Sequence, residues 1–586
     1  MTLSRFQFAP LIGLRPRTAA AALLPVLIAA AGCGEGPTDP PPSSGCAELA
    51  PVSLAAGAHT VVDPTADAGC VRLPGGGASE YLYVALSASG TETQNGVQSS
   101  YRIRGGVPAT AAPPAARVGP TAAAARAAAE ADPARAFHAR LRAREGTLRP
   151  DAATQERARL SASLTSLVQP PVIGETRTFK VCATDQCTSF VDVPATVKFA
   201  APSGKVAIYL DDTVPANGYT QADIDNVGAL FDSYLYPIDT TAFGRESDLD
   251  ANGVVVVLLT DQVNTLSGAC TQTGSIILGY FYGADLIPSQ TGSNRGEVFY
   301  GLVPDPDNST CRVSRNFASR LLPPTFVHEF QHMISFNQHV LARDGFSEDT
   351  WLNEGLSHYA EELAGRTIPN QFCSPNNQGT PDCFTQFTLS NVDNAYEYLS
   401  DVESHFLIEP GSSSGTLEER GANWLFVRWL ADHFGSLTPE GTNPTATRAL
   451  VETNRIGAAN VQAVTSGTFP TLVTEWQLAN YLDDLAGFTP ASPRLSYRSW
   501  NFRNTFASLN QQSPSSFPRP YPLVADTALN GNYTRTGTLR GGSGRHVLIL
   551  QDGGAGAAVD LQVTDSAGAA VLPAATSPRV GLVRIR

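Results

Sequence analysis

Two histidines and a glutamate occur in a spacing that can hold a metal ion. The stretch Thr325-Phe-Val-His328-Glu329-Phe-Gln-His332 places His328 and His332 four residues apart. On an α-helix, residues four apart lie on one face, so both imidazoles can bind the same ion. Zinc accepts neutral imidazole nitrogens, and a catalytic zinc site needs three protein ligands plus a water. The stretch therefore predicts a zinc site on a helix, which we expect over residues 326–342.

Glu329 follows the first histidine directly, where its carboxylate can reach a metal-bound water without binding the metal. There it can accept a proton as the water attacks a carbonyl group, and then pass this proton to the leaving amine. The pattern predicts Glu329 as the general base of a hydrolase, and the alternative is two histidines that bind nothing. The flanking residues favour a buried active-site helix because they are apolar: Phe326, Val327, Phe330, Met333 and Ile334.

A third ligand has to come from elsewhere in the chain, and Glu354 in Trp351-Leu-Asn-Glu354-Gly is the candidate. The interval after His332 leaves room to finish one helix, turn at Asp344-Gly345 and start a second helix, expected over residues 351–364. The alternative is that Glu354 is an ordinary acid near a helix N-terminus, where the macrodipole favours it.

His-Glu-x-x-His followed by Trp-Leu-Asn-Glu-Gly resembles the gluzincin metallopeptidases, and among them the hyicolysin family of bacterial peptidases. Further stretches are similar over about residues 200–490. The resemblance implies an α+β catalytic domain with zinc bound by His328, His332 and Glu354, acting on protein or peptide substrates. It also implies an endopeptidase, because the Gly-x-Met-Glu-Asn signature of the related aminopeptidases does not occur. The similar stretches are Phe243-Gly-Arg-Glu-Ser-Asp-Leu-Asp-Ala-Asn-Gly253, Leu259-Thr-Asp-Gln-Val-Asn, Gly279-Tyr-Phe-Tyr-Gly-Ala-Asp-Leu and Glu297-Val-Phe-Tyr.

Two readings besides an endopeptidase stay open at this stage. One is an aminopeptidase. The other is a surface lipoprotein whose β-domains bind a partner, with an inactive peptidase core. The intact Glu329 between two histidines argues against a relic core, because a relic has no need of the base.

A hydrogen-bond donor to the oxyanion is expected besides the metal. The candidates are His358, Tyr359, Tyr280 and Tyr282. His358 lies one helical turn after Glu354 and could instead support a metal ligand from behind, with Glu361 as the carboxylate. We rank this supporting role for the helix face above direct catalysis.

Asp248-x-Asp250-x-Asn252-Gly253 resembles the first half of a calcium-binding loop. The twelfth position of such a loop would be Leu259, so the usual bidentate acid is missing. We therefore favour a turn built by Asx side chains before the next strand. A Ca²⁺ site near Asp248, Asp250 and Asn252 requires another acid from outside the loop.

The composition indicates several folded domains. The chain has 586 residues, of which 42% are hydrophobic and 16% are charged, and its net charge is −14. This supplies enough apolar material for packed cores. An acidic chain without a dense basic patch is not expected to bind nucleic acid.

The N-terminus predicts export. Residues 1–32 combine an arginine-containing start with a short apolar run and resemble a signal peptide. The small residues before Cys33 resemble a lipobox, although Ala30 replaces the usual leucine. We expect a lipid anchor at Cys33, a Pro-rich tether over 33–45, and a place in the cell envelope as an outer-membrane or cell-surface lipoprotein, or release from it. The alternative is ordinary secretion.

The remaining eight cysteines are an even number, as expected for disulfides in an exported chain. They lie as four neighbouring pairs, which is the pairing that we expect.

The pattern along the chain divides it further. Residues 46–106 predict a small β-domain, and residues 107–170 a linker or helical pro-segment in which 122–144 can form helix broken at Pro133. Residues 171–495 contain strands first and helices later, so the predicted fold is an α+β catalytic domain with a β-rich N-terminal part. Residues 500–586 predict a C-terminal β-domain, so that small β-sandwich-like domains flank the catalytic domain.

Overall fold

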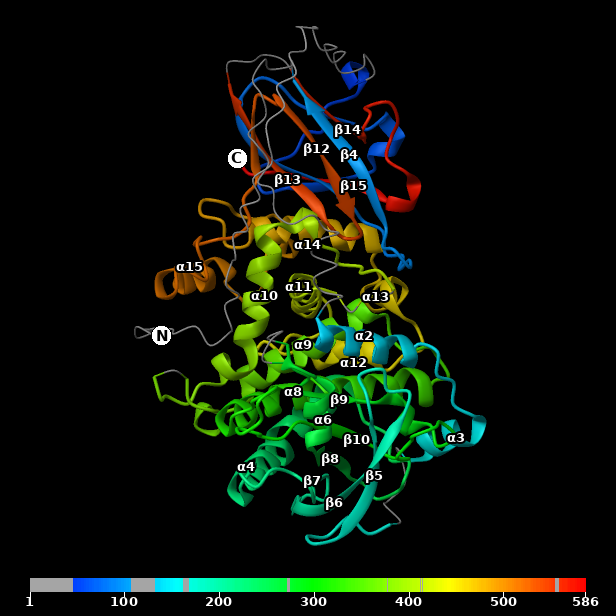
Figure 1. Cartoon of the computed structure of the whole chain (residues 1–586). Helices are drawn as coiled ribbons and strands as arrows, with labels where there is room; N and C mark the ends of the chain where they lie inside the picture. Colours follow the sequence, from blue (N-terminus) through cyan, green and yellow to red (C-terminus); the bar gives the residue numbers. More distant parts are fainter. Residues whose placement is uncertain are drawn as a thin grey trace, which may run out of the picture.

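The computed structural model describes residues 46–106, 132–161, 168–270, 275–376, 378–411, 413, 415–553 and 558–586. The predicted signal peptide, Cys33 and the tether lie outside these ranges. Figure 1 shows three tiers: a six-stranded sheet carrying helices, a helical layer, and a unit of two further sheets. The predicted α+β class is confirmed, with strands preceding helices in the central region and additional sheets built from the terminal regions.

The six-stranded sheet lies below helix α8 (Arg315–Phe336) in the view of Figure 1. Its order is β5 (Thr176–Cys182), β6 (Phe190–Ala200), β7 (Val206–Asp211), β8 (Val255–Leu259), β10 (Val298–Gly301) and β9 (Gly279–Phe281). The strands β7, β8 and β10 are parallel, whereas β6 and β9 run antiparallel to their neighbours. All five residues of β8 are buried, as the run of valines and leucines predicts. Strand β9 is an edge strand, and helix α8 contacts it.

Helix α8 begins earlier than expected. Ser314 caps its N-terminus by accepting a hydrogen bond from the Phe317 N–H, and the helix continues through Pro323 and Pro324. A proline within a helix leaves the carbonyl four residues earlier without its N–H partner. For Pro324 this carbonyl belongs to Arg320, and the side-chain amide of Gln386 donates to it at 2.8 Å. This tertiary hydrogen bond satisfies the carbonyl that Pro324 leaves without a partner, so the helix can begin before the prolines instead of at Phe326, where the sequence alone predicted its start.

The helical layer lies above α8. The second predicted helix is α9 (Thr350–Thr367), and α11 (Leu417–His433) crosses it closely. A Cβ on Gly355 would lie 2.8 Å from the Asn423 carbonyl oxygen, so glycine is required at this crossing. The other helices of the sheet-bearing tier and the helical layer are α4 (Gln221–Leu230), α5 (Tyr236–Phe243), α6 (Asp261–Leu266), α10 (Leu389–Ser400), α12 (Pro444–Val451), α13 (Gly457–Thr465), α14 (Phe469–Leu482) and α15 (Phe502–Gln512).

The two terminal β-regions form one unit instead of two separate domains. One sheet has the order β1 (His59–Val62), β15 (Pro578–Arg584), β3 (Ala78–Ser87), β13 (Gly544–Asp552) and β11 (Asp526–Leu529). The other has the order β12 (Tyr533–Arg540), β4 (Gln98–Gly105), β14 (Val559–Asp565) and β2 (Cys70–Leu73). Strand β3 pairs on both sides with strands from the C-terminal region. Neither region alone satisfies the hydrogen bonds of its strands, which is why the expected division at the two ends does not describe the fold.

The segment expected to be a linker or pro-segment contains α2 (Pro133–Glu145) and α3 (Ala152–Ser161) in its described part. Pro133 starts α2 instead of breaking a longer helix, because the fixed φ and missing N–H of proline suit the first helical position. The side chain of Asp132 caps this end. Residues 107–131 lie outside the described ranges.

The four disulfides join neighbouring cysteines as expected and are typical of proteins that fold in an oxidising compartment. They are Cys46–Cys70, Cys182–Cys187, Cys270–Cys311 and Cys373–Cys383. None of the helices in the described ranges has an apolar stretch long enough to span a lipid bilayer.

Candidate active site

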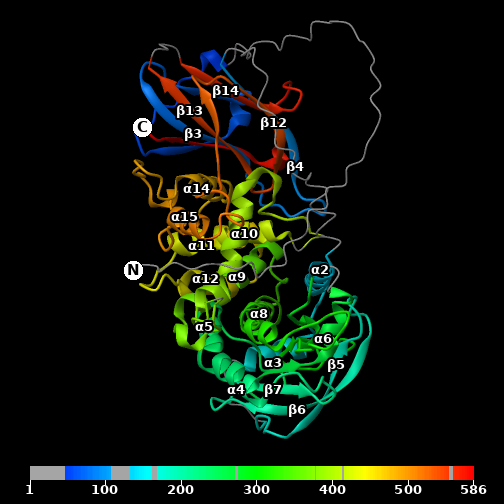
Figure 2. The same cartoon turned by 60° about the vertical axis from the view of Figure 1, so that its left-hand side comes forward.

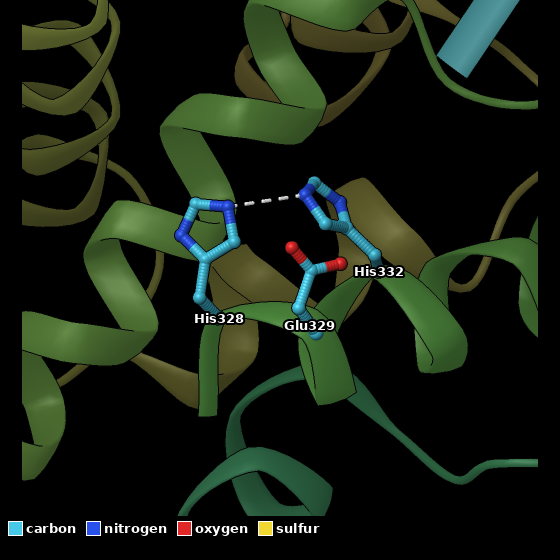
Figure 3. Close-up of side chains that lie close together, drawn as sticks. All are labelled: His328, Glu329 and His332. Atoms are coloured by element: carbon cyan, nitrogen blue, oxygen red, sulfur yellow. Dashed lines mark hydrogen bonds between the residues drawn. The ribbon is translucent and has the colours of Figure 1, made fainter. Parts of the chain in front are cut away.

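The site is built on two neighbouring helices, α8 and α9. The Nε2 atoms of His328 and His332 lie 3.2 Å apart, as the dashed line in Figure 3 shows. Glu354 on α9 places one carboxylate oxygen 3.3 Å from the His328 Nε2 and the other 3.7 Å from the His332 Nε2. Ligands bound tetrahedrally to zinc at about 2.05 Å lie about 3.3 Å from each other. The three side chains thus have the spacing that one zinc ion requires.

The Glu329 carboxylate lies beside the two histidine rings on helix α8 (Figure 3). The backbone N–H of Phe281, in edge strand β9, donates to its Oε2 at 3.0 Å. This bond fixes the carboxylate, and only 2% of the residue's surface is exposed. Burial raises the pKa of Glu329, and a raised pKa suits a group that has to accept a proton.

Glu361 supports the first histidine from behind. Its Oε1 lies 2.7 Å from the His328 Nδ1 and 3.1 Å from the His358 Nδ1. A carboxylate on Nδ1 fixes the ring orientation and leaves Nε2 free to bind metal. The structure thus brings together the histidine and the carboxylate that the sequence suggested for this supporting role. His332 has a different neighbour, because the Ser357 hydroxyl lies 3.2 Å from its Nδ1.

Arg420 is a member of the site that the sequence did not reveal. It lies on α11, and its Nη1 is 2.9 Å from the Glu354 Oε2. Burial disfavours the charge of Glu354, but Arg420 and the two histidines hold the pKa of this carboxyl well below its usual range. Arg420 reaches the site through the close crossing of α9 and α11 at Gly355, which no local motif announces.

The local electrostatics favour positive charge on His328, whereas burial and Arg142 lower the pKa of His332. Burial lowers the pKa of His328, but Glu354 and Glu361 outweigh this effect and raise it to about 10. The two carboxylates therefore stabilise a proton on this imidazole. The same negative potential favours a metal cation in place of the proton.

The candidates for the oxyanion donor lie in different places. The ring of His358 lies beside that of His328, with 4.8 Å between their centroids, so His358 is at the site. Tyr359 is not brought to it, because its ring packs against Phe243 and the guanidinium of Arg428. The two tyrosines of the β9 region are also occupied elsewhere, with Tyr280 stacked on Tyr300 and Tyr282 under Arg144.

Helix α2 contributes two further groups that the sequence analysis missed. The His138 Nδ1 lies 3.7 Å from the Glu329 Oε1, and the Arg142 Nη2 lies 3.7 Å from the Glu329 Oε2. In Figure 1 and Figure 2, α2 lies at the level where the six-stranded sheet meets the helical layer. An Ala- and Arg-rich composition gives no signal for such a position.

The loop before β8 contains the Asx turn that the sequence predicts. The Asn252 Oδ1 accepts a hydrogen bond from the Val254 N–H at 2.7 Å, and the Asp248 Oδ1 accepts one from Gly253 at 2.9 Å. An acid from outside the loop does approach it. Carboxylate oxygens of Asp248, Asp250 and Glu297 lie within 4.8 Å of one another.

No protein-family model matches the chain. Part of it is similar to a curated protein, the neutral metalloprotease ShpI of Staphylococcus hyicus, with 33% identity over 227 residues. The matched part is 37% of this chain and 44% of that protein, so the chain spans less than half of the relative's length. This distant, partial similarity and the buried His-Glu-x-x-His group both point to a metallopeptidase-type site.

Proposed function

We propose that the protein is an exported zinc-dependent endopeptidase. One observation carries this proposal: His328, His332 and Glu354 converge with the spacing of a tetrahedral zinc site, and Glu329 lies beside them. The partial similarity to a neutral metalloprotease supports the same reaction class. The proposed metal ligands are these three residues, and the proposed substrates are proteins or peptides.

The chain's own residues divide the work of hydrolysis. Zinc, when bound, lowers the pKa of a water and polarises the scissile carbonyl. Glu329, held by the Phe281 N–H, accepts the proton of the attacking water and returns it to the leaving amine. Glu361 keeps the His328 Nδ1 occupied, so that Nε2 faces the metal. His358, beside His328 and bonded to the same carboxylate, acts as a positioning residue in this scheme.

Export and anchoring are part of the proposal. The four disulfides support folding outside the reducing cytoplasm. A lipid on Cys33 and attachment to the cell envelope rest on the sequence of the first 45 residues. Intact mass measurement of the protein purified from its native envelope tests this part, since a diacylated N-terminal cysteine has a defined mass.

The test of the reaction starts with metal content. The full chain should contain one zinc, and His328→Ala should lose it. Glu329→Gln should keep zinc and lose activity by about 10³-fold, because only the proton transfer is removed. Glu440→Gln, which changes an exposed acid, is the matched control and should behave as wild type.

The choice of substrate separates the remaining alternatives. An endopeptidase cleaves an N-acetylated, internally quenched peptide, whereas an aminopeptidase needs a free N-terminus. An inactive core cleaves neither, even with stoichiometric zinc. Proteolysis that is unaffected by phenanthroline or by Glu329→Gln would contradict the proposed mechanism.

A further inference from the structure

We propose that Asp248, Asp250 and Glu297 form a structural Ca²⁺ site at the start of β8. This site is separate from the zinc ligands and does not depend on the proposed peptidase activity. It is assembled from two segments: the loop that leads into β8, and the residue directly before β10. Because β8 and β10 pair in parallel, starting at Val256 and Val298, the two segments meet at the same edge of the sheet.

The loop has the geometry of a calcium-binding turn. Gly253 adopts φ +74°, and its N–H donates to the Asp248 Oδ1 at 2.9 Å. A glycine at the sixth position that turns the chain sharply is a feature of calcium loops, and Asp248, Asp250 and Asn252 occupy the first, third and fifth positions. What such a loop still needs is an acid in place of the one that is absent at its twelfth position.

Glu297 supplies this acid from outside. It is 2% exposed, and its Oε1 accepts hydrogen bonds from the Ser247 hydroxyl at 2.5 Å and the Leu249 N–H at 3.1 Å. Its Oε2 is buried and has no hydrogen-bond partner among the described residues. A buried carboxylate oxygen without a partner is costly, and a bound cation removes this cost.

The distances and charges fit calcium. The carboxylate oxygens of the three acids lie within 4.8 Å of one another, and two oxygens on one Ca²⁺ at about 2.4 Å can be up to about 4.8 Å apart. Burial and the negative charge of Asp250 raise the pKa of Glu297 to about 8, so the protein groups around Glu297 disfavour its charged form. An all-oxygen ligand set suits Ca²⁺ better than Mg²⁺, which requires stricter octahedral geometry and retains its waters.

Calcium titration of the zinc-loaded full chain tests this site. Glu329→Gln is used as the background in order to prevent self-cleavage. We expect calorimetry to show one Ca²⁺ bound per chain, at least tenfold more tightly than Mg²⁺, and the melting temperature to rise with Ca²⁺. Glu297→Gln and Asp250→Asn should each weaken Ca²⁺ binding at least tenfold with zinc content unchanged, whereas Glu440→Gln should not.

The two variants protect the test against a folding defect. Asp250 is only half-buried, so Asp250→Asn remains informative if Glu297→Gln does not fold. Absence of Ca²⁺ binding to the parent protein would overturn the proposal. Equal Ca²⁺ affinity in the parent and Asp250→Asn would overturn it as well, and equal affinity for Mg²⁺ would remove the assignment to calcium.

An independent observation concerns α2, and from it we infer that α2 holds the peptidase in a latent form. This inference rests on the proposed function. Edge strand β9 could pair with an extended peptide through its free edge. Instead, the Arg142 guanidinium donates to the Phe281 carbonyl at 3.3 Å, and the Gly283 N–H just beyond the strand donates to the Glu145 carboxylate at 3.0 Å.

The same helix is anchored beside the proposed base. Phe137 is fully buried and packs edge-on against Tyr280, with 5.0 Å between the ring centroids. His138 and Arg142 approach both oxygens of Glu329. A substrate peptide that uses the β9 edge and the Glu329 carboxylate therefore has to displace α2.

Phe137→Ala tests latency, because Phe137 anchors α2 without an ion pair or hydrogen bond to Glu329. If α2 competes with substrate, the variant should lower the KM for the quenched peptide at least tenfold and leave kcat unchanged. Ala143→Gln, at an exposed position of the same helix, is the control and should leave both constants unchanged. Arg142→Ala should shift the KM in the same direction.

The kinetic constants of these variants separate a failure of the latency inference from a failure of the proposed endopeptidase function. A fall in kcat with unchanged KM in Phe137→Ala would mean that α2 is a permanent support of the site, and would overturn latency. Unchanged constants in Phe137→Ala and Arg142→Ala would overturn it too. If all variants bind zinc but none cleaves any peptide, the proposed endopeptidase function fails instead.

Discussion

Glu361 offers a direct test of how the second helix supports the proposed zinc ligands. Its Oε1 lies within hydrogen-bond distance of both the His328 Nδ1 and the His358 Nδ1, and only 10% of its side-chain surface is exposed. Removing a carboxylate behind a metal-binding histidine lowers metal affinity by about 10- to 100-fold, equivalent to about 1.4–2.7 kcal/mol. Because the 2.7 Å bond is short and shielded from solvent, we expect Glu361→Leu to reach about 100-fold.

Glu361→Gln should have a smaller effect. Its amide oxygen can still accept the hydrogen bond from His328, but the negative charge is lost, so we expect about a tenfold loss of zinc affinity. Zinc dissociation constants are measured by competition with a chromophoric chelator, and circular dichroism of the metal-free proteins reports their folding. Glu440→Gln should match the wild type. Zinc affinity of Glu361→Leu within about twofold of wild type would refute the role assigned to this carboxylate.

Three further predictions concern the stability of the fold. Burial lowers the pKa of His546 to about 4, so the unfolded chain binds a proton at this residue before the folded chain does as the pH falls below 6.5. The protein should therefore lose about 3 kcal/mol of stability between pH 6.5 and pH 4. His546→Gln should reduce this loss in melting temperatures measured against pH. Gln386→Leu removes the donor to the Arg320 carbonyl at the proline in α8, and should lower the free energy of unfolding by about 2 kcal/mol in denaturant titrations. Gly355→Ala should destabilise by about 1–3 kcal/mol, despite the better helix propensity of alanine, because its Cβ would meet the Asn423 carbonyl at 2.8 Å; equal or higher stability would contradict the tight crossing.

The short-range features of the site followed from the sequence. The four-residue spacing of His328 and His332 determines a shared helix face, since helix geometry is local. The interval to Glu354 permits one helix to end and a neighbour to begin, and the structure places this carboxylate within 3.7 Å of both histidines. The four disulfides also joined the cysteines nearest in sequence.

Long-range features required the tertiary structure. The sequence contains no sign that Arg420 pairs with Glu354, because this pair depends on how closely α9 and α11 cross. The same holds for Glu297, which meets the Asp248 loop only through the parallel register of β8 and β10.

The pairing of the terminal β-regions is a larger example of contacts between distant segments that the sequence did not predict. Each region has strand-forming sequence, and each was expected to fold as its own domain, yet β3 from one end lies between β13 and β15 from the other. Strand propensity is a local property, whereas the choice of hydrogen-bonding partner depends on which edges are free once the whole chain has packed. The sequence by itself thus determined which side chains the two adjacent helices bring together, and only the packing of distant segments decided what surrounds, supports and covers them.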